Sequence, residues 1–445
     1  MNIRKTAILI LLLLPWVAIK AQESRTLNEC IRFALEHNLD RQVYELNEQK
    51  ARIDATQSKL NLLPSLSASS SAGISFGRSV DEYSNQVINN EYFNNSNSLN
   101  SSVGIFHGFI QTNRIAWSKL QLESAKWRKI SFQDELAFDI LVSFYDVIYY
   151  QGLIEIAREQ LQLSEFNLKK TETQVETGLK ARMDLAEMQA TYEKEMLNLI
   201  QSENKLETAR LKLARQMNLP AGQLAGIQFE NGELAVSPMS PADADSLFES
   251  FVSFSPYVKI AEAELLAAGK SVAIARGQYY PTVSLGASVS TGYYETNQDE
   301  QGKPIPFADQ LQNNRSQYLG ASVSIPIFNK NQARSELRKA QLSKEQAEVQ
   351  LDNYRQAVYY ELMNNFRDLQ ALFREQLQTQ KQAEANELAY RVAERKYGEG
   401  MIDVIELQAV KNRLADAQNQ LLLAKLQREV KNKIMDFYTG VRFWE

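Results

Sequence analysis

The chain has 445 residues, a formal net charge of −5, 44% hydrophobic residues and one cysteine, Cys30. The acidic balance argues against a nucleic-acid partner, and a single cysteine excludes an internal disulfide bond. The length corresponds to roughly three ordinary domains, but the order of elements along the chain indicates two repeats instead.

The N-terminus has the features of a secretory signal peptide. Arg4 and Lys5 precede a short apolar run, and Ala21 is a small residue suited to cleavage. The run is too short and too interrupted to span a membrane well. We expect residues 1–21 to be removed. This loss of three basic residues and no acidic ones changes the net charge from −5 to −8.

The mature chain repeats one order of elements: helix, strand, loop, strand, long helix, turn, helix. The first repeat spans residues 22–220 and the second residues 258–445, with a linker rich in proline and glycine at residues 221–257. The expected elements are strands at about 65–77 and 96–107 with a helical hairpin at 110–219, and strands at about 282–294 and 318–328 with a hairpin at 331–438.

The predicted strands alternate between apolar and small polar residues. Leu66, Ala68 and Ile74 share one face of the first strand, and serines occupy most of the other face. An apolar face opposite a small polar face is typical of a membrane β-barrel strand, with lipid outside and water inside. Long polar loops at residues 78–98 and 295–317, with aromatic residues beside them, predict the extracellular side of such a barrel.

Two stretches of the chain contain no proline and almost no glycine, and this composition predicts long helical hairpins. Apolar residues recur at steps of three and four from Leu337 to Leu377, which is the stripe of an amphipathic helix close to a coiled-coil seam. The roughly 67 residues before the second turn would extend about 100 Å. Because this length exceeds the thickness of a bilayer, we expect the helices to stand in water.

Four strands are too few to close a membrane barrel. The smallest single-chain barrels have eight strands, and an open sheet edge is not tolerated in lipid. The chain must therefore associate with copies of itself. Two, three or four chains would each supply enough strands, so strand counting alone leaves the number of chains open.

At this level of detail the chain resembles the TolC-like outer membrane efflux proteins of Gram-negative bacteria. The resemblance covers the whole mature chain. It rests on the strands that follow Pro64 and Pro281 and on the strand-to-helix junctions at residues 105–108 and 327–330. It also rests on the match between residues 178–184 and residues 400–406. It implies an α/β membrane protein that is internally duplicated: a trimeric channel-tunnel, in which a twelve-stranded β-barrel with four strands per chain stands on a long α-helical coiled-coil duct.

The resemblance also implies a periplasmic gate at the two hairpin turns. Tyr397 matches the family's gate tyrosine, Asp184 the aspartate that it ties to, and Glu406 the acid that rings the aperture. The family's basic gate residue falls on Ile402, and a second aperture acid falls on Ala409.

Asp403 lies one turn before Glu406 and is a candidate replacement for that second acid. Glycines at the turns, Gly178, Gly398 and Gly400, supply permissive backbone geometry. A ring of Glu406 side chains would attract cations. Alternatively, these carboxylates are solvated residues at helix starts, where the helix dipole favours negative charge.

No enzymatic site is expected. The only histidines, His37 and His107, fall in different elements, and no metal-ligand spacing, cofactor motif or nucleophile–base pair is present. The sequence therefore predicts no catalytic, cofactor or metal residues.

The predicted function is that of a passive exit duct in the outer membrane, with its helical part in the periplasm. The resemblance implies export of small molecules such as drugs and toxic compounds, within a tripartite efflux or type I secretion system. The implied partners are two further copies of the chain, outer-membrane lipid, a periplasmic adaptor that docks in grooves between the hairpins, and an inner-membrane transporter of the RND, ABC or MFS type. The alternative is a periplasmic coiled-coil scaffold or adaptor subunit without a barrel. The strand alternation favours the barrel.

Overall fold

The computed structural model describes residues 24–80, 85–89, 91–220, 228–229, 244–442 and 444. The predicted signal peptide, residues 1–21, and most of the predicted linker lie outside these residues. The described chain divides into two compact units. We call residues 44–129 and 256–355 the sheet unit, and the remaining described residues the helical unit.

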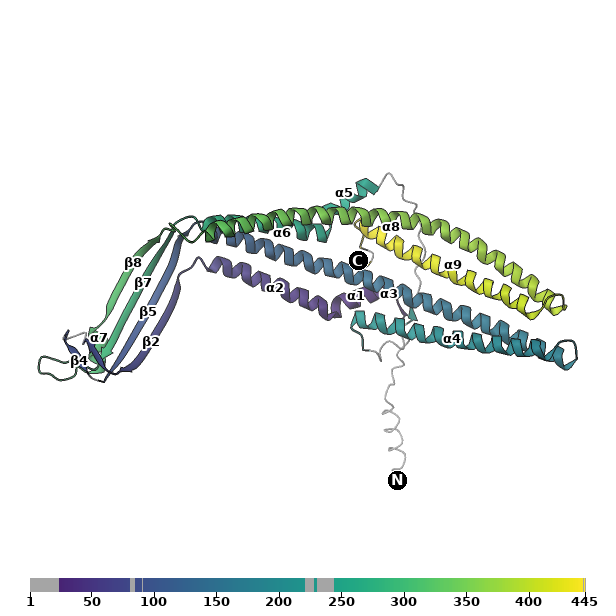
Figure 1. Ribbon diagram of the computed structural model, residues 1–445, viewed down its shortest axis with the longest axis horizontal. Helices are drawn as coiled ribbons and strands as arrows, with labels where there is room; N and C mark the ends of the chain where they lie inside the picture. Colours follow the sequence, from purple (N-terminus) through teal and green to yellow (C-terminus); the bar gives the residue numbers. More distant parts are fainter. Residues whose placement is uncertain are drawn as a thin grey trace, which may run out of the picture. The chain divides into compact units, whose positions relative to one another are not determined.

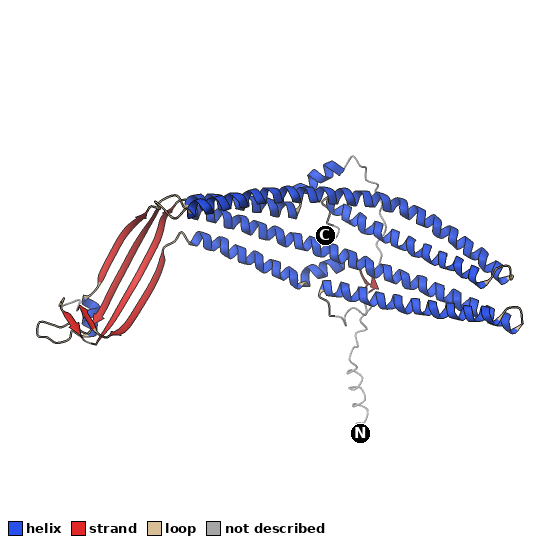
Figure 2. Ribbon diagram, viewed as in Figure 1, coloured by secondary structure: helices blue, strands red, loops and turns tan. Residues whose placement is uncertain are grey.

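The sheet unit contains one four-stranded antiparallel sheet (Figure 2). Its strands are β2 (Ser65–Ser75), β5 (Tyr92–His107), β7 (Thr282–Tyr294) and β8 (Ser316–Ser324), hydrogen-bonded in the order β2-β5-β7-β8. The two repeats therefore each contribute two neighbouring strands. The outer edges of β2 and β8 have no partner strand within the described chain.

Backbone conformation and strand pairing set the ends of the strands. β2 stops at Ser75, shortly before Gly77 with its positive φ of 110°. β5 begins at Tyr92, earlier than the predicted residue 96, because its first residues pair with the end of β2. β8 ends at Ser324 rather than at the predicted residue 328. Pro326 follows, and a proline has no N–H to donate to a strand ladder.

The predicted loops contain small elements of their own. A short hairpin of β3 (Arg78–Val80) and β4 (Val87–Asn89) follows β2, and helix α7 (Phe307–Asn313) precedes β8. Gln310 of α7 is 1% exposed. Its amide accepts a hydrogen bond from the Tyr294 N–H at 3.0 Å and donates one to the Tyr294 carbonyl at 3.0 Å, which fixes α7 on the end of β7.

The register gives the sheet two chemically different faces. On one face, apolar residues are cross-strand neighbours in rows, such as Ala68–Leu99–Val289 and Val103–Leu285–Ala321. Most of these side chains are exposed, and Leu319, which pairs with Ala287 on the same face, is 81% exposed. A water-soluble sheet would cover such a face, whereas lipid accommodates it.

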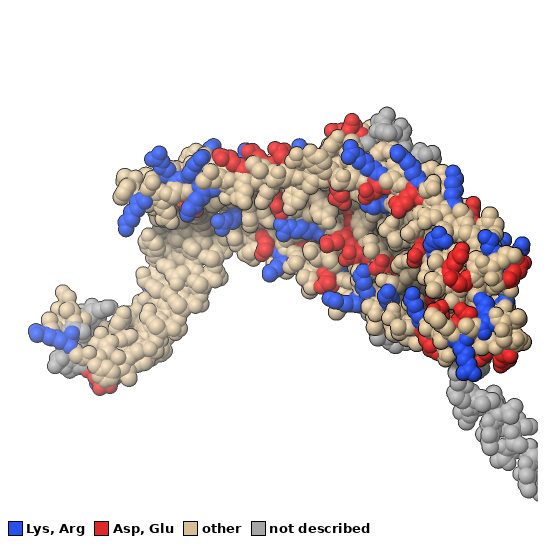
Figure 3. Space-filling model, turned by 45° about the vertical axis from the view of Figure 1, so that its right-hand side comes forward, with Lys and Arg blue, Asp and Glu red and all other residues tan. Residues whose placement is uncertain are grey.

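The opposite face carries hydroxyl groups. Serine pairs across neighbouring strands share hydrogen bonds, with Oγ–Oγ distances of 2.7 Å for Ser69–Ser98, 3.0 Å for Ser65–Ser102 and 2.8 Å for Ser284–Ser322. The four strands contain no Lys, Arg, Asp or Glu. In the space-filling view, the charged side chains accordingly gather on the helices and leave the strands bare (Figure 3).

A β-bulge interrupts the alternation at the helical end of β5. The register with β7 shifts between Gly104 and Phe106, so that Phe106 lies opposite Val283. The extra residue is Ile105, which is 60% exposed. A bulge bends a strand and increases its twist, and this one lies five residues before the start of helix α3.

The helices follow the predicted order. They are α1 (Leu27–His37), α2 (Leu39–Leu60), α3 (Ile110–Glu176), α4 (Arg182–Met217), α5 (Ala244–Phe254), α6 (Pro256–Gly277), α8 (Gln332–Gly398) and α9 (Val404–Tyr438). α3 and α8 have 67 residues each and contribute to both units. A parallel pair of two-residue strands, β1 (Ser24–Arg25) and β6 (Gln228–Phe229), completes the described elements.

The helical unit contains two helical hairpins, α3–α4 and α8–α9 (Figure 1). Apolar side chains of both hairpins pack together in one cluster. One described helix, α3, has a stretch apolar enough to cross a membrane by length and composition, and 44% of that stretch is buried. Ile140, Leu141 and Phe144 of α3 are nearly inaccessible. Packing within the helical unit therefore accounts for part of the apolar character of α3.

We expect a charged side chain to destabilise the protein to different extents on the two faces of the sheet. Leu319→Arg, on the apolar face, should destabilise the folded protein in lipid by about 2–4 kcal/mol, because arginine is costly near the bilayer midplane. Ser322→Arg, on the hydroxyl face of the same strand, should cost much less. Urea titration of both variants in lipid vesicles measures this difference. Equal destabilisation would contradict the assignment of the faces.

Candidate functional site

The two hairpin turns have the same backbone design. Gly178 and Gly400 lie 222 residues apart, with φ of 76° and 73°. After each glycine the next N–H reaches back to a carbonyl five residues earlier, Leu179 to Gln174 and Met401 to Lys396, both at 2.8 Å. This is a Schellman motif, in which glycine adopts the left-handed conformation that ends a helix.

The third predicted turn glycine, Gly398, has a different environment. It is the last residue of α8, and a Cβ there would lie 2.6 Å from the Lys170 Nζ. Gly178 and Gly400 are thus required by backbone conformation, whereas Gly398 leaves room for a side chain of the neighbouring hairpin.

The carboxylates after each turn help to start the next helix. The Asp184 Oδ2 accepts a hydrogen bond from the Ala181 N–H at 3.2 Å, before α4. The Asp403 Oδ1 accepts one from the Glu406 N–H at 2.8 Å, before α9. Asp184 and Asp403 therefore have helix-capping roles. Glu406, the equivalent of Asp184 in the second hairpin, has an exposed side chain.

Tyr397 joins the two hairpins. Its side chain is 0% exposed, and its hydroxyl shares a hydrogen bond of 2.8 Å with the Thr171 Oγ1 of α3. The Lys180 Nζ of the first turn lies 3.5 Å from the centre of the tyrosine ring, which is a cation–π arrangement. Within the described chain, the partners of Tyr397 are thus Thr171 and Lys180. The tie between Tyr397 and Asp184 that the resemblance implies stays a prediction.

Ile402 belongs to an apolar cluster. The cluster's buried members are Met188, Tyr390, Ala393, Tyr397, Val404, Leu407, Val410 and Leu414, and Ile402 packs against them with Leu163 and Leu168. At the position where the family resemblance places a basic residue, this chain therefore has a side chain that contributes to apolar packing around Tyr397.

A buried ion pair in the same region was not predicted from the sequence. The Lys411 Nζ of α9 donates to the Ser164 Oγ of α3 at 2.5 Å and to the Glu195 Oε1 of α4 at 3.1 Å. The side chains of Lys411 and Glu195 are 2% and 9% exposed. Burial lowers the pKa of Lys411, and the neighbouring Glu195 carboxylate opposes that shift.

The sequence does contain a signal for this pair. Leu407, Lys411 and Leu414 follow one another at steps of four and three, so Lys411 occupies an apolar stripe of α9. A charged residue in such a stripe requires a partner, because an unpaired buried charge is strongly destabilising. The partner could not be identified from spacing, since Glu195 lies on a different hairpin.

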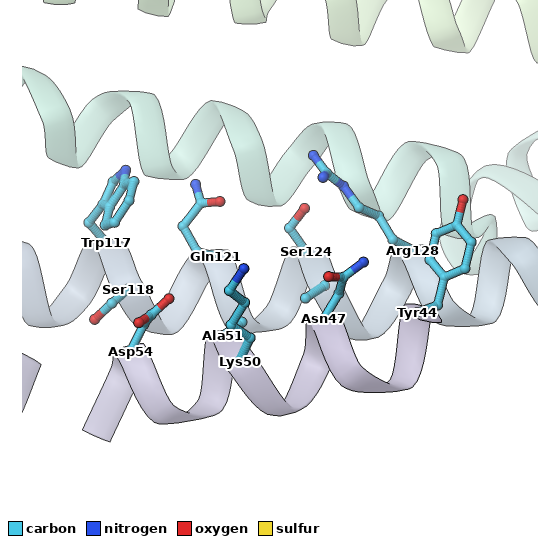
Figure 4. Close-up of a pocket in the computed structure, with 11 residues that line it drawn as sticks. Tyr44, Asn47, Lys50, Ala51, Asp54, Trp117, Ser118, Gln121, Ser124 and Arg128 are labelled. Carbon is cyan, nitrogen blue, oxygen red and sulfur yellow. The ribbon is translucent and has the colours of Figure 1, made fainter. Parts of the chain in front are cut away.

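A cavity of about 410 Å³ lies between α2 and α3 in the sheet unit (Figure 4). Trp117, Gln121, Ser124 and Arg128 line it from α3, and Tyr44, Asn47, Lys50 and Asp54 line it from α2. Arg128 is ion-paired with Glu264 of α6. None of the predicted gate residues lines this cavity. The described residues also contain no group of three or more His, Cys, Asp or Glu side chains arranged to hold a metal ion.

The comparisons with known proteins agree with this architecture. The family profile of the outer membrane efflux proteins matches residues 30–219 and 251–440. The pyoverdine export outer membrane protein OpmQ of Pseudomonas aeruginosa is 26% identical over 317 residues, which cover 69% of this chain and 62% of that protein. The matched region thus spans less than two thirds of this curated relative.

Solved structures of outer-membrane channels have the same fold. The outer membrane protein VceC of Vibrio cholerae aligns with a TM-score of 0.78 at 16% identity, covering 94% of this chain and 97% of that one. The CmeC outer membrane channel of Campylobacter jejuni aligns with a TM-score of 0.80 at 14% identity, covering 93% and 85%.

The fold is that of a trimeric outer-membrane channel-tunnel, in which each chain supplies four strands to the barrel and long helices to the duct. The chain belongs to the outer membrane efflux protein family. The predicted fold class and the location in the outer membrane are confirmed.

Removing the buried charge of Lys411 should loosen the packing of the hairpins. Lys411→Met leaves Glu195 buried without its cation, and we expect a loss of about 3–5 kcal/mol in the free energy of unfolding. The double variant Lys411→Met, Glu195→Gln removes both charges and should recover part of that loss. Chemical denaturation of the detergent-solubilised protein, followed by circular dichroism, measures both. If the free energy of unfolding of Lys411→Met equals that of the wild type, the ion pair contributes nothing to stability.

Proposed function

We propose that the protein is a passive exit duct for small molecules, acting as the outer-membrane component of a tripartite efflux or type I secretion system. The observation that carries this proposal is the sheet, with an exposed uncharged apolar face suited to lipid and a hydroxyl-lined face suited to a water-filled pore. A periplasmic scaffold without a barrel would not account for an exposed apolar face on the sheet.

The comparisons support small molecules as cargo. The curated relatives include a pyoverdine export outer membrane protein and a toluene efflux pump outer membrane protein. We extend that class to this chain. The hydroxyl face of the sheet carries no charge that would select among such compounds. An inner-membrane transporter would supply the energy.

The contacts of Tyr397 support a gate at the hairpin turns. The tyrosine holds the end of α8 against α3 through Thr171 and lies under Lys180. We place the exposed Glu406 at the aperture, where three copies would form an acidic ring. Like charges close together repel one another and attract cations. The capping bonds of Asp184 and Asp403 support a structural role for these two residues at the turns.

Two features of the helical unit support docking of a periplasmic adaptor. A groove of about 540 Å³ lies between α3, α8 and α9, lined by residues such as Tyr145, Tyr149 and Leu372. At the turns, Leu179 and Met183 are 77% and 70% exposed, and their equivalents 222 residues later, Met401 and Ile405, are 68% and 66% exposed. Duplicated exposed apolar pairs of this kind mark an interaction surface. A photo-crosslinking residue placed at position 401 in cells tests whether an adaptor contacts this surface.

Conductance recordings test the duct and its gate together. Tyr397→Phe removes the hydroxyl that bonds Thr171, a bond worth about 1 kcal/mol, and should raise the basal conductance of the protein in planar bilayers. Thr171→Val removes the same bond from the other side and should have the same effect. Tyr149→Phe is the matched control, because Tyr149 also bonds across the hairpins, to Asn419 at 3.0 Å, but far from the turns along the chain.

Two results would contradict these assignments. If the wild-type protein forms no pores in any bilayer, the exit-duct proposal is wrong. If it forms pores and Tyr397→Phe conducts like the wild type, the duct stands and Tyr397 is not part of the gate.

Ion selectivity tests the aperture separately. Glu406→Gln should reduce the preference for cations, measured as the reversal potential across a salt gradient, because it removes three negative charges from one ring. Glu399→Gln removes the same number of charges from the turn itself and should change selectivity less. Unchanged selectivity in Glu406→Gln would remove this residue from the aperture.

A further inference from the structure

The two ends of the four-stranded sheet differ in charge. The loop end, residues 76–91 and 295–315, contains three basic and seven acidic residues. At the helical end, the thirteen residues next to each strand contain eight basic and two acidic residues in total. These segments are residues 52–64, 108–120, 269–281 and 325–337. Figure 3 shows basic side chains gathered at the end of the helices beside the strands. This excess is local, because the chain as a whole has a net charge of −5.

At each of the four strand-to-helix junctions, the nearest cation lies at almost the same distance from the strand. Lys59 and Arg276 come six residues before β2 and β7, Lys330 comes six residues after β8, and Arg114 comes seven residues after β5. We call these four residues the junction cations. No acidic residue lies between any of them and its strand. All four side chains are exposed, and none forms an ion pair within the described chain.

An exposed apolar or aromatic side chain lies between each junction cation and its strand. These residues are Leu63, Phe109, Tyr280 and Phe328, which are 63%, 59%, 44% and 84% exposed. Apolar and aromatic groups followed by a cation match the order of groups at a membrane surface, where acyl chains end and headgroups begin. Six helical residues rise about 9 Å. The junction cations therefore lie at the level of the headgroups when the strands cross the hydrocarbon.

We propose that the junction cations bind the phosphate groups of anionic phospholipids in the periplasmic leaflet of the outer membrane. Three copies of the chain would together supply twelve such cations at one level of the barrel. Each lysine or arginine near an anionic membrane surface contributes about fivefold in affinity, so several cations at one level distinguish an anionic lipid from a zwitterionic one. The proposal rests on the location in the outer membrane and not on the exit-duct function.

The alternative occupant of the junction cations is an anionic solute inside the pore. The residues around them favour lipid, because an exposed apolar or aromatic side chain accompanies every junction cation. The face of the sheet suited to a water-filled pore is instead lined by hydrogen-bonded serine pairs, such as Ser69–Ser98 and Ser284–Ser322. A solute site in the pore is therefore treated as an outcome of the test that would contradict the proposal.

Native mass spectrometry of the full-length protein in detergent tests the proposal, with phosphatidylglycerol and phosphatidylcholine as the two probes. We expect the wild type to bind phosphatidylglycerol at least about tenfold more tightly than phosphatidylcholine. The junction variant should reduce this preference to about twofold or less, because it removes the four charges. Its substitutions are Lys59→Gln, Arg114→Gln, Arg276→Gln and Lys330→Gln.

A matched control variant removes the same number of lysines and arginines from exposed positions of the helical unit. Its substitutions are Lys205→Gln, Arg367→Gln, Arg374→Gln and Lys381→Gln. This variant should keep the preference of the wild type. Equal binding of both lipids to the wild type, or an unchanged preference in the junction variant, would overturn the proposal. Inorganic phosphate that displaces phosphatidylglycerol at an equal phosphate concentration would also overturn it, because the site would then bind a free anion.

Two further measurements complete the test. In the wild type, raising the salt concentration from about 0.05 M to about 0.5 M should weaken the preference for phosphatidylglycerol, because salt screens exposed charges. This measurement does not depend on the folding of a variant, and a preference independent of salt would overturn the proposal. In planar bilayers, a junction variant that keeps the lipid preference but shifts the reversal potential would place the cations in the pore. Neither contrary result bears on whether the wild type forms pores, so the exit-duct proposal is tested separately.

Discussion

The structure depends on the pairing of backbone groups at the edges of a four-stranded sheet. In lipid, no water is available to bond the free N–H and C=O groups along β2 and β8, so an open sheet cannot persist there. Closure by further copies of the chain satisfies both edges at once. This constraint determines the rest of the barrel: the apolar rows face outward, the serine rows face the pore, and the helices attached to the edge strands become neighbours across the same boundary.

Internal duplication supplies two hairpins with one backbone plan, and side-chain differences give them different roles. Both turns have a left-handed glycine and a Schellman motif. The residue equivalent to Tyr397 in the first hairpin is Val175, and the residue equivalent to Lys411 is Gln189. Only the second hairpin therefore carries the tyrosine and the lysine that anchor it to the first. A structure built from two similar halves thus acquires an asymmetric connection near its turns.

The two anchoring contacts differ in their physical character. Tyr397 contributes one neutral hydrogen bond and a cation–π contact, which are individually weak and reversible. Lys411 and Glu195 form a buried ion pair, in which each charge depends on the other because neither is solvated. We regard the ion pair as the permanent connection between the hairpins and the tyrosine contact as the one that can open, which is consistent with the position of Tyr397 three residues from the turn glycine.

The sequence by itself determined the elements and their order. Period-two alternation identified the strands, the absence of proline and glycine identified the long helices, and the duplicated order identified the family, because these features are local in the chain. Errors of a few residues at strand ends arose where Pro326 and pairing with β2 decided the boundary. Only the tertiary structure decided the partners: Thr171 for Tyr397, Glu195 and Ser164 for Lys411, and the apolar cluster around Ile402. These contacts join helices far apart in sequence, and spacing along one helix carries no information about which residue of another helix lies opposite.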